Sequence, residues 1–407
     1  MKSIKIFSFC NIYIFLWIIY SLQNFVFGRV GSIYSRIIIL FLLLVSLYYT
    51  YYALSRYKLP SYMKGLAVFV TVLSIYGLFL MLFSSTLQKS SGEFVSSYTY
   101  LQRILCSFLP VFPVYVFTVQ GKFNKIVLQW WIPVFFVAAT LVFYQHQQQR
   151  LLLAIQAGSR QEEFTNNFGY EFLALLPLMA FYSKKKILQY IGIAYAMVFM
   201  LMAMKRGAII IGFICIIYFM QFSFRDEKRG KKIIIVLLSI VVITVIYNAF
   251  NRLLVSSDYF NTRFNSTLEG KSSGRDYLFS TYFDFFINQS NILTFLFGHG
   301  ANSTVRLFGQ FAHNDWLELA INQGVLGVVV YAAYWIRFYK SKRQARFDDE
   351  VYLAISLLLI SNFLRSFFSM SYGDMSIFAT VCLGYCMGMI NEHENHLKCV
   401  SNKRLQI

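Results

Sequence analysis

The chain has 407 residues, of which 57% are hydrophobic and 14% are charged, and its formal net charge at pH 7 is +19. Repeated long apolar runs exclude a water-soluble fold, because a helix that crosses lipid needs ~20 such residues to satisfy its backbone internally. The composition therefore predicts an all-α polytopic membrane protein with a single integral membrane domain over residues 1–407.

Long apolar runs recur from the N-terminus to the C-terminus, and each one marks an expected helix. We expect about twelve transmembrane helices, at residues 5–22, 37–54, 65–83, 100–118, 126–144, 170–183, 187–204, 207–222, 233–249, 317–338, 351–368 and 375–390. The run at 170–183 is the shortest of these, and the turn at Lys205 and Arg206 between two runs is very tight.

The positive charge is spread over alternate short loops between the expected helices, from Lys2 and Lys5 to Lys403 and Arg404. Lys and Arg close to helix ends are retained on the cytoplasmic side, so this pattern predicts that both termini are cytoplasmic. Because the charge does not follow one face or arm, it indicates anionic membrane lipid rather than nucleic acid as the partner.

With this topology two external loops are long, at about residues 145–170 and 250–316, and the others are short. In the second, large loop we expect short surface helices at 277–286 and near the apolar run 293–297. Neither loop is long enough for a core of its own, so both must pack on the helix bundle. Function is therefore expected in these two loops.

The stretch FAHNDWLELAINQGVLG, residues 311 to 327, places polar residues directly before an apolar run. Asp315-x-x-Glu318 has the form of a capping box, with Asp315 as N-cap and Glu318 reaching back, so the tenth helix should begin at Trp316. His313 and Asn314 then lie just outside the helix start, at the outer membrane surface.

Chemistry alone leaves two interpretations of this stretch open. In the first, His313 is only an interfacial polar residue and the two acids only cap the helix. In the second, the helix N-terminus, which favours an anion through its unpaired N–H groups, is part of a site in which His313 takes part. Gly324 and Gly327 would in either case let another helix approach closely.

Three arginines lie on the same side of the expected bundle as His313: Arg160 in the first long loop, Arg206 between two apolar runs, and Arg275 in the second long loop. An arginine at the edge of the hydrocarbon snorkels or finds a partner. Together with a histidine, the three describe an anion site with a base beside it. The planar guanidinium suits phosphate oxygens, and a lipid-linked diphosphate is the anion available at a membrane surface.

The same residues carry a resemblance to a known family. FGHG followed by AHNDWLELAINQGVLG is similar to the signature of the O-antigen polymerase and ligase superfamily of bacterial surface-polysaccharide enzymes. Further marks similar to that family follow its order, at Arg160, Asn166 and Asn167, at Lys205 to Ala208 (KRGA), and at Ser273 to Arg275 (SGR). The family usually has serine where this chain has Lys205, and a proline beside asparagine where it has Asn166-Asn167.

The resemblance implies an inverting glycosyltransferase of the bacterial inner membrane. It would transfer an oligosaccharide from undecaprenyl diphosphate to a sugar hydroxyl of another lipid-linked repeat at the periplasmic face, and a chain-length regulator is a candidate partner. Polymerase is favoured by the form of the motif at 312–327. The alternatives are a ligase that moves the polymer to lipid A-core and, from a different class, a lipid-linked oligosaccharide flippase.

Histidine is partly available as a base at neutral pH, so we expect His313 to act as general base, with Asn314 and Asp315 orienting it or capping the helix. Arg160, Arg206 and Arg275 would stabilise the leaving diphosphate. His299 is the rival base, but it lies between Gly298 and Gly300, where a tight turn makes the backbone the important feature.

Carboxylates offer a competing mechanism, because Glu162, Glu163, Asp276 and Asp284 also lie in the two long loops. A paired carboxylate could act as the base or hold a divalent metal. These loops lack an Asp-x-Asp motif, the chain has no P-loop, and its six cysteines suggest neither a metal cluster nor a disulfide framework. We therefore expect no metal and no cofactor.

Overall fold

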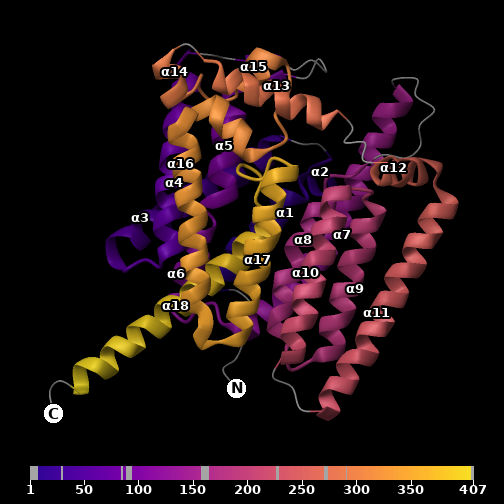
Figure 1. Ribbon diagram of the computed structural model, residues 1–407. Coiled ribbons are helices and arrows are strands. Elements are labelled where there is room, and N and C mark those ends of the chain that lie inside the picture. The colour runs from indigo at the N-terminus through magenta and orange to yellow at the C-terminus, as the bar shows by residue number, and fades with distance from the viewer. Residues whose placement is uncertain are drawn as a thin grey trace.

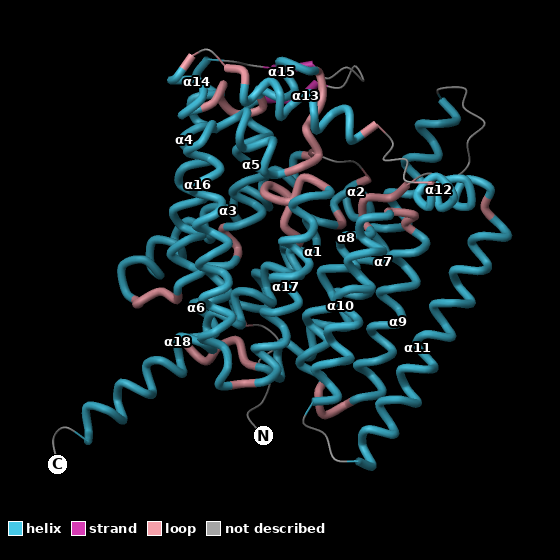
Figure 2. Tube along the Cα trace, viewed as in Figure 1, coloured by secondary structure: helices cyan, strands magenta, loops and turns pink. Residues whose placement is uncertain are grey.

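The computed structural model describes residues 8–28, 31–83, 86–88, 94–156, 165–225, 229–269, 274–289 and 291–404. Most of these residues are helical, and loops and turns join the helices, as Figure 2 shows. The strands among them form a short antiparallel ribbon in which β1 (Thr86–Gln88) pairs with β2 (Phe94–Ser96). The expected all-helical class is therefore confirmed apart from this ribbon.

Eight helical segments of the described chain are long and apolar enough to cross a membrane. One of them combines two helices, α5 and α6, which follow each other closely. The eight are α3 (Ile33–Arg56), α4 (Ser61–Phe83), α5 (Ser97–Phe108) with α6 (Val111–Val119), α7 (Lys125–Gln156), α10 (Arg206–Arg225), α11 (Arg229–Ser256), α16 (Asp315–Gln344) and α17 (Asp349–Phe368). The chain is thus a polytopic membrane protein by the length and hydropathy of its helices.

Helices also cover the four other segments at which we expected spans, but these do not have the length and hydropathy of a span. They are α1 (Phe9–Ser21), α8 (Gly169–Leu175) continued by the 3-10 helix η1 (Leu176–Tyr182), α9 (Lys186–Met202) and α18 (Ile377–Arg404). In η1 every residue is buried, so protein rather than lipid surrounds this short segment. The structure therefore supports eight spans where the sequence suggested about twelve.

Basic connections between the helices gather at one end of the bundle, the lower end in Figure 1, which we call the basic end. There Lys125 pairs with Glu350, which also accepts a hydrogen bond from Ser183, and Arg225 lies 3.9 Å from Asp349. The 3-10 helix η2 (Ala345–Phe347) turns the chain at the same end. Loops that are far apart in the sequence thus share one end, as their common charge predicted.

Four short helices cover the opposite end, which we call the loop end: α12 (Asp258–Leu268), α13 (Arg275–Ile287), α14 (Ile292–Phe297) and α15 (Ser303–Phe308) (Figure 1). Another short helix, α2 (Gln23–Phe27), follows α1. The surface helices expected at 277–286 and 293–297 are present as α13 and α14, whereas α12 and α15 were not predicted. The expected loop at 145–170 is wrong over 145–156, where α7 continues through good helix formers such as Gln, Leu and Arg.

Candidate active site

The N-cap of α16 is Asn314, whose side-chain oxygen accepts hydrogen bonds from the backbone N–H groups of Trp316 (2.9 Å) and Leu317 (3.2 Å). The helix therefore begins at Asp315, one residue before the predicted start, and the prediction of Asp315 as N-cap is wrong. Asparagine is as good an N-cap as aspartate, and using it leaves the Asp315 carboxylate for another partner.

Asp315 is fully buried and joins α16 to the segment that follows α17. It accepts hydrogen bonds from the backbone N–H of Ser371 (2.7 Å), from the Ser371 hydroxyl and from the Tyr331 hydroxyl (2.7 Å). A buried carboxylate with three donors fixes the geometry of its neighbours. Asp315 thus holds residues 369–376 against α16.

Glu318 reaches back from α16, as the capping-box pattern suggested, but to a different residue. Its buried carboxylate accepts from the backbone N–H of Ala312 (2.8 Å), from the Asn322 amide (3.0 Å) and from the Thr304 hydroxyl. Ala312 directly precedes His313, so Glu318 holds the backbone on one side of the histidine. The N-cap Asn314, whose amide contacts the Phe367 carbonyl at 3.4 Å, holds the other side.

His313 is exposed and has a backbone φ of +54°, in the left-handed region that few non-glycine residues adopt. Histidine tolerates this region better than most residues, but the conformation persists only where the surroundings determine it. Here the hydrogen bonds of Ala312 with Glu318 and of Asn314 with Phe367, on either side of His313, hold the backbone in this conformation. The turn that carries His313 consequently lies at the loop end, beside the C-terminal end of α17.

Arg275 begins α13 and donates a hydrogen bond of 2.9 Å to the carbonyl of Phe368. The preceding carbonyl, that of Phe367, is the one that Asn314 contacts. Two consecutive carbonyls at the end of α17 therefore bring Arg275 to the same place as the His313 turn. These residues are separated by about forty positions in the sequence, and their association was expected.

Arg206 begins α10, and Gly207 after it packs on both Tyr170 and Phe368. A β-carbon at Gly207 would lie 2.5 Å from the Tyr170 hydroxyl and 3.5 Å from the Phe368 β-carbon. The start of α10 thus lies against the carbonyl-bearing end of α17 to which Arg275 binds. Arg160, the third predicted arginine, lies outside the described residues, as do Glu162 and Glu163.

Arg365 and Tyr170 were not predicted as site residues from the sequence. Arg365 is only 6% exposed, its guanidinium donates to Asp374 Oδ2 (2.7 Å) and to the Asp374 carbonyl (3.1 Å), and it lies 4.5 Å from the centre of the Tyr170 ring. Lys205 lies 6.0 Å from that ring and donates to Asn167 Oδ1 at 2.7 Å. The available signal was an arginine close to the end of the apolar run 351–368, the same signal that drew attention to Arg206.

We call Lys205, Arg206, Arg275 and Arg365, whose backbone segments meet at Tyr170 and Phe368, the basic cluster. Its four cations come from α10, α13 and α17 and from the residue before α10. Two of them, Lys205 and Arg365, lie at the Tyr170 ring, which stabilises a cation, and Arg275 binds the Phe368 carbonyl. Asp276 and Asp284, the carboxylates of the competing mechanism, are both exposed on α13 and do not form a buried pair.

His299 acts mainly through its backbone, as the flanking glycines predicted. Its N–H donates to the Ile321 carbonyl and that of Gly300 donates to the Asn322 carbonyl, both at 2.9 Å. Its ring lies 5.3 Å from that of Phe285, and burial, with a smaller contribution from Arg306, lowers the pKa of His299. His299 is thus partly buried against Phe285, whereas His313 is exposed.

The turn at 298–300 docks on a break in α16. Gly324 has φ +67° and ψ −158°, which frees the carbonyls of Ile321 and Asn322 from the helix. A β-carbon at Gly324 would lie 2.6 Å from the Gly298 nitrogen, and one at Gly298 would lie 2.4 Å from the Asn322 carbonyl oxygen. The prediction of a close approach holds at Gly324, where the end of α14 and the 298–300 turn approach, but is wrong at Gly327, whose nearest neighbours are Gln323 and Leu319 of α16 itself.

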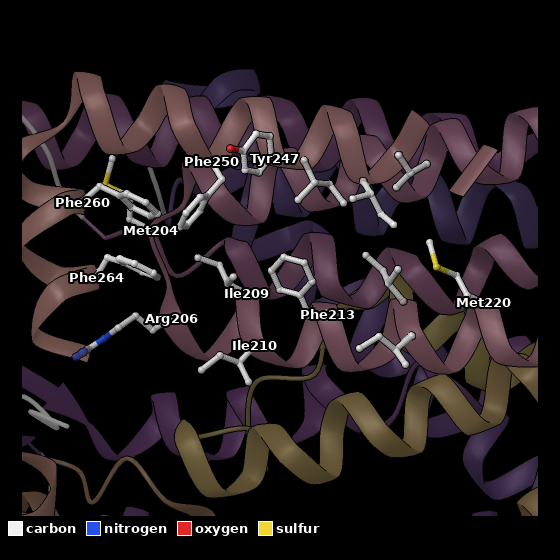
Figure 3. Close-up of a pocket in the computed structure, with 15 residues that line it drawn as sticks. Met204, Arg206, Ile209, Ile210, Phe213, Met220, Tyr247, Phe250, Phe260 and Phe264 are labelled. Carbon is white, nitrogen blue, oxygen red and sulfur yellow. The ribbon is translucent and has the colours of Figure 1, made fainter. Parts of the chain in front are cut away.

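An apolar cavity of about 580 Å³ lies between α10 and α11, with α12 at one end. Arg206 is the one charged residue among those that line it. In Figure 3 Arg206 lies at one end of the cavity, near Met204 and Phe264, with its guanidinium nitrogens directed out of it, and Met220 lies at the other end. The cavity therefore has a hydrocarbon-like wall along two membrane-length helices and a fixed cation at its mouth.

Comparison with known proteins adds no relative: no protein-family model and no curated protein matches the chain. The resemblance to the O-antigen polymerase and ligase superfamily thus depends on the motif residues alone. Those of them that the structure describes, at 166–167, 205–208, 274–275, 297–300 and 312–327, lie at the loop end, where Asn167 binds Lys205, Arg275 binds the Phe368 carbonyl and the 298–300 turn binds α16.

Proposed function

We propose that this protein is a surface-polysaccharide polymerase, which transfers an oligosaccharide from undecaprenyl diphosphate to a sugar hydroxyl of another lipid-linked repeat. The observation that carries the proposal is the apolar cavity with Arg206 at its mouth, adjoining the basic cluster and the exposed His313. A long prenyl chain needs an apolar groove, and its diphosphate needs fixed cations where the groove ends.

In the proposed reaction the imidazole of His313 takes the proton of the acceptor hydroxyl. The hydroxyl oxygen forms a bond to the anomeric carbon of the donor, and the bond from that carbon to the diphosphate oxygen breaks. The diphosphate leaves with the electron pair, and Arg206 and Arg275 stabilise its charge. Attack from the side opposite the leaving group inverts the anomeric centre. One bond forms and one breaks, His313 holds the proton, and the two arginines stabilise the charge of the diphosphate, so the step needs no metal.

The proposal includes an orientation, with the basic end in the cytoplasm and the loop end in the periplasm of the bacterial inner membrane. Supporting it, the lysine-rich and arginine-rich connections gather at the basic end, where the positive-inside rule expects them. Both the donor and the acceptor would then meet the site from the outer leaflet.

The test compares surface polysaccharide on gels from cells that lack the gene and carry wild type, His313→Gly or His396→Ala. Glycine removes the imidazole while suiting the φ of +54°, and His396 is an exposed residue on the polar half of α18. We expect a full ladder from wild type and His396→Ala, and only core plus a single repeat from His313→Gly, at equal membrane levels.

A full ladder from His313→Gly would contradict the role of His313 as base. If deletion instead leaves bare core with finished polymer on the lipid carrier, the protein is a ligase. If deletion leaves single repeats on the cytoplasmic leaflet, it is a flippase. The lipid-linked species are separated by extraction before the gel.

A further inference from the structure

A second cavity, of about 400 Å³, lies near the basic cluster and differs from the apolar one in its lining. It is formed by the end of α1, by α5, α7 and the start of α8, and by residues 373–378. Flat aromatic rings and planar polar groups face it together; those on which the argument depends are Trp17, Tyr20, Gln23, Arg103, Glu171 and Asp374. Cavities of ~300–1,000 Å³ with a few placed polar groups are typical small-molecule sites.

Hydrogen bonds already fix the polar walls of this cavity. The Ser376 hydroxyl donates to Glu171, and Arg365 holds Asp374 at 2.7 Å. On the opposite wall the Gln102 amide donates to the Tyr20 hydroxyl at 3.0 Å. A ligand would therefore meet groups that are held in position before it binds, which lowers the cost of binding.

The charges around the cavity nearly cancel, unlike those of the basic cluster. Asp374 is paired with Arg365, Arg103 is a cation, and burial raises the pKa of Glu171 to about 7, so the lining carries at most about one excess positive charge. Such a lining fits a neutral ligand with many hydroxyls better than a diphosphate. A carboxylate accepts hydrogen bonds from hydroxyl groups, and an aromatic ring such as that of Trp17 covers the apolar face of a sugar.

The cavity is linked to the catalytic residues on two sides. Arg103, which lines it, lies 5.9 Å from the centre of the Phe311 ring, two residues before His313. Asp374, on another wall, is held by Arg365 of the basic cluster, which lies over Tyr170. A sugar in the cavity would thus have the proposed base near one side and the proposed diphosphate site near another.

We infer that this cavity binds the terminal sugar of the acceptor, with Glu171 accepting its hydroxyls and Trp17 covering its ring. The inference depends on the proposed function and adds the acceptor subsite to it. Neither Glu171 nor the cavity was indicated by the motifs, so the binding experiment tests it independently of the residues that carry the resemblance.

The experiment uses the full-length protein in lipid nanodiscs and the oligosaccharide that mild acid releases from the host's own lipid carrier. Binding is measured by saturation-transfer NMR titration for wild type, Glu171→Gln, Cys106→Trp and Asp284→Asn. Cys106 lines the cavity, so tryptophan there fills it, and Asp284 is an exposed carboxylate on α13 that serves as matched control.

We expect wild type and Asp284→Asn to bind equally. Burial raises the pKa of Glu171 to about 7, so the titration is made well above that pH, where the carboxylate is ionised. Under that condition Glu171→Gln should raise the dissociation constant roughly tenfold, because a hydrogen bond to a charged acceptor is replaced by one to a neutral acceptor. Cys106→Trp should abolish saturation transfer. Inorganic diphosphate should not displace the oligosaccharide, because the cavity lacks the excess positive charge of the basic cluster.

Wild-type affinity in Glu171→Gln, absence of binding by wild type, or displacement by diphosphate would each overturn the inference. Size-exclusion profiles show whether each variant is folded, and the near-isosteric Glu171→Gln decides the matter if Cys106→Trp does not fold. A ladder that requires His313, together with unchanged affinity in Glu171→Gln, would refute the acceptor subsite alone. Weakened binding in Glu171→Gln with a full ladder from His313→Gly would refute the catalytic proposal alone.

Discussion

Asn314, Asp315 and Glu318 divide three tasks at the start of α16: capping, attachment of the segment after α17, and support of the His313 turn. The sequence pattern assigned capping to the two acids, because aspartate and asparagine are nearly equivalent as N-caps. Only tertiary contacts distinguish them. The Ser371 N–H that binds Asp315 comes from the segment after α17, and the Tyr331 hydroxyl comes from beyond the break in α16, so no local helix pattern predicts either contact.

Replacement of Glu318 tests its supporting role. Glu318→Ala leaves three donors without their acceptor, on Ala312, Thr304 and Asn322, so we expect the free energy of unfolding to fall by about 3 kcal/mol or more. The measurement is denaturant unfolding in mild detergent, followed by tryptophan fluorescence. Asp284→Ala, which removes an exposed carboxylate, should change the value by less than about 0.5 kcal/mol. An equal effect of the two substitutions would contradict the assignment.

At the scale of elements, α16 is a broken helix whose break is the docking surface for the turn at 298–300. Its two freed carbonyls accept from His299 and Gly300, so the break leaves no orphaned acceptor at these positions. The helix, its two glycines and the surface helix α14 were predictable from the sequence. The break was not, because a Gly-x-x-Gly pattern fits helix crossings equally well.

Because the break depends on Gly324, we expect it to be sensitive to substitution there. Gly324→Ala would place a β-carbon 2.6 Å from the Gly298 nitrogen at a φ of +67°, so we expect a loss of about 2 kcal/mol or more. Gly230→Ala in α11 is the matched control: nothing lies within 4 Å, and the change should be neutral or slightly stabilising. Thermal unfolding of both variants, with wild type alongside, checks the difference. Similar melting temperatures for the two would show that the break tolerates a side chain.

For the whole molecule, the apolar runs predicted where helices lie but overestimated how many have the form of spans. The segment α8–η1 is short and surrounded by protein, and hydropathy cannot distinguish lipid from buried side chains as its environment. Among the site residues, Arg275 and His313 were found because they stand out in polar loops. Arg365, Tyr170 and Glu171 were missed because they lie at the ends of apolar runs, where only the packing of the bundle brings them together.

The separation of the molecule into a basic end and a loop end leads to a prediction about orientation. In a background in which the other cysteines are replaced by alanine, the native Cys399 near the end of α18 is compared with a variant that carries Asp284→Cys on α13. Both positions are exposed, so their labelling differs only by the side of the membrane on which they lie. A membrane-impermeant maleimide should label Asp284→Cys in intact spheroplasts and Cys399 only after the membrane is opened, because the lysines and arginines of the basic end keep it in the cytoplasm. Labelling of Cys399 in intact spheroplasts would invert the proposed topology and remove His313 from the face where lipid-linked repeats are joined.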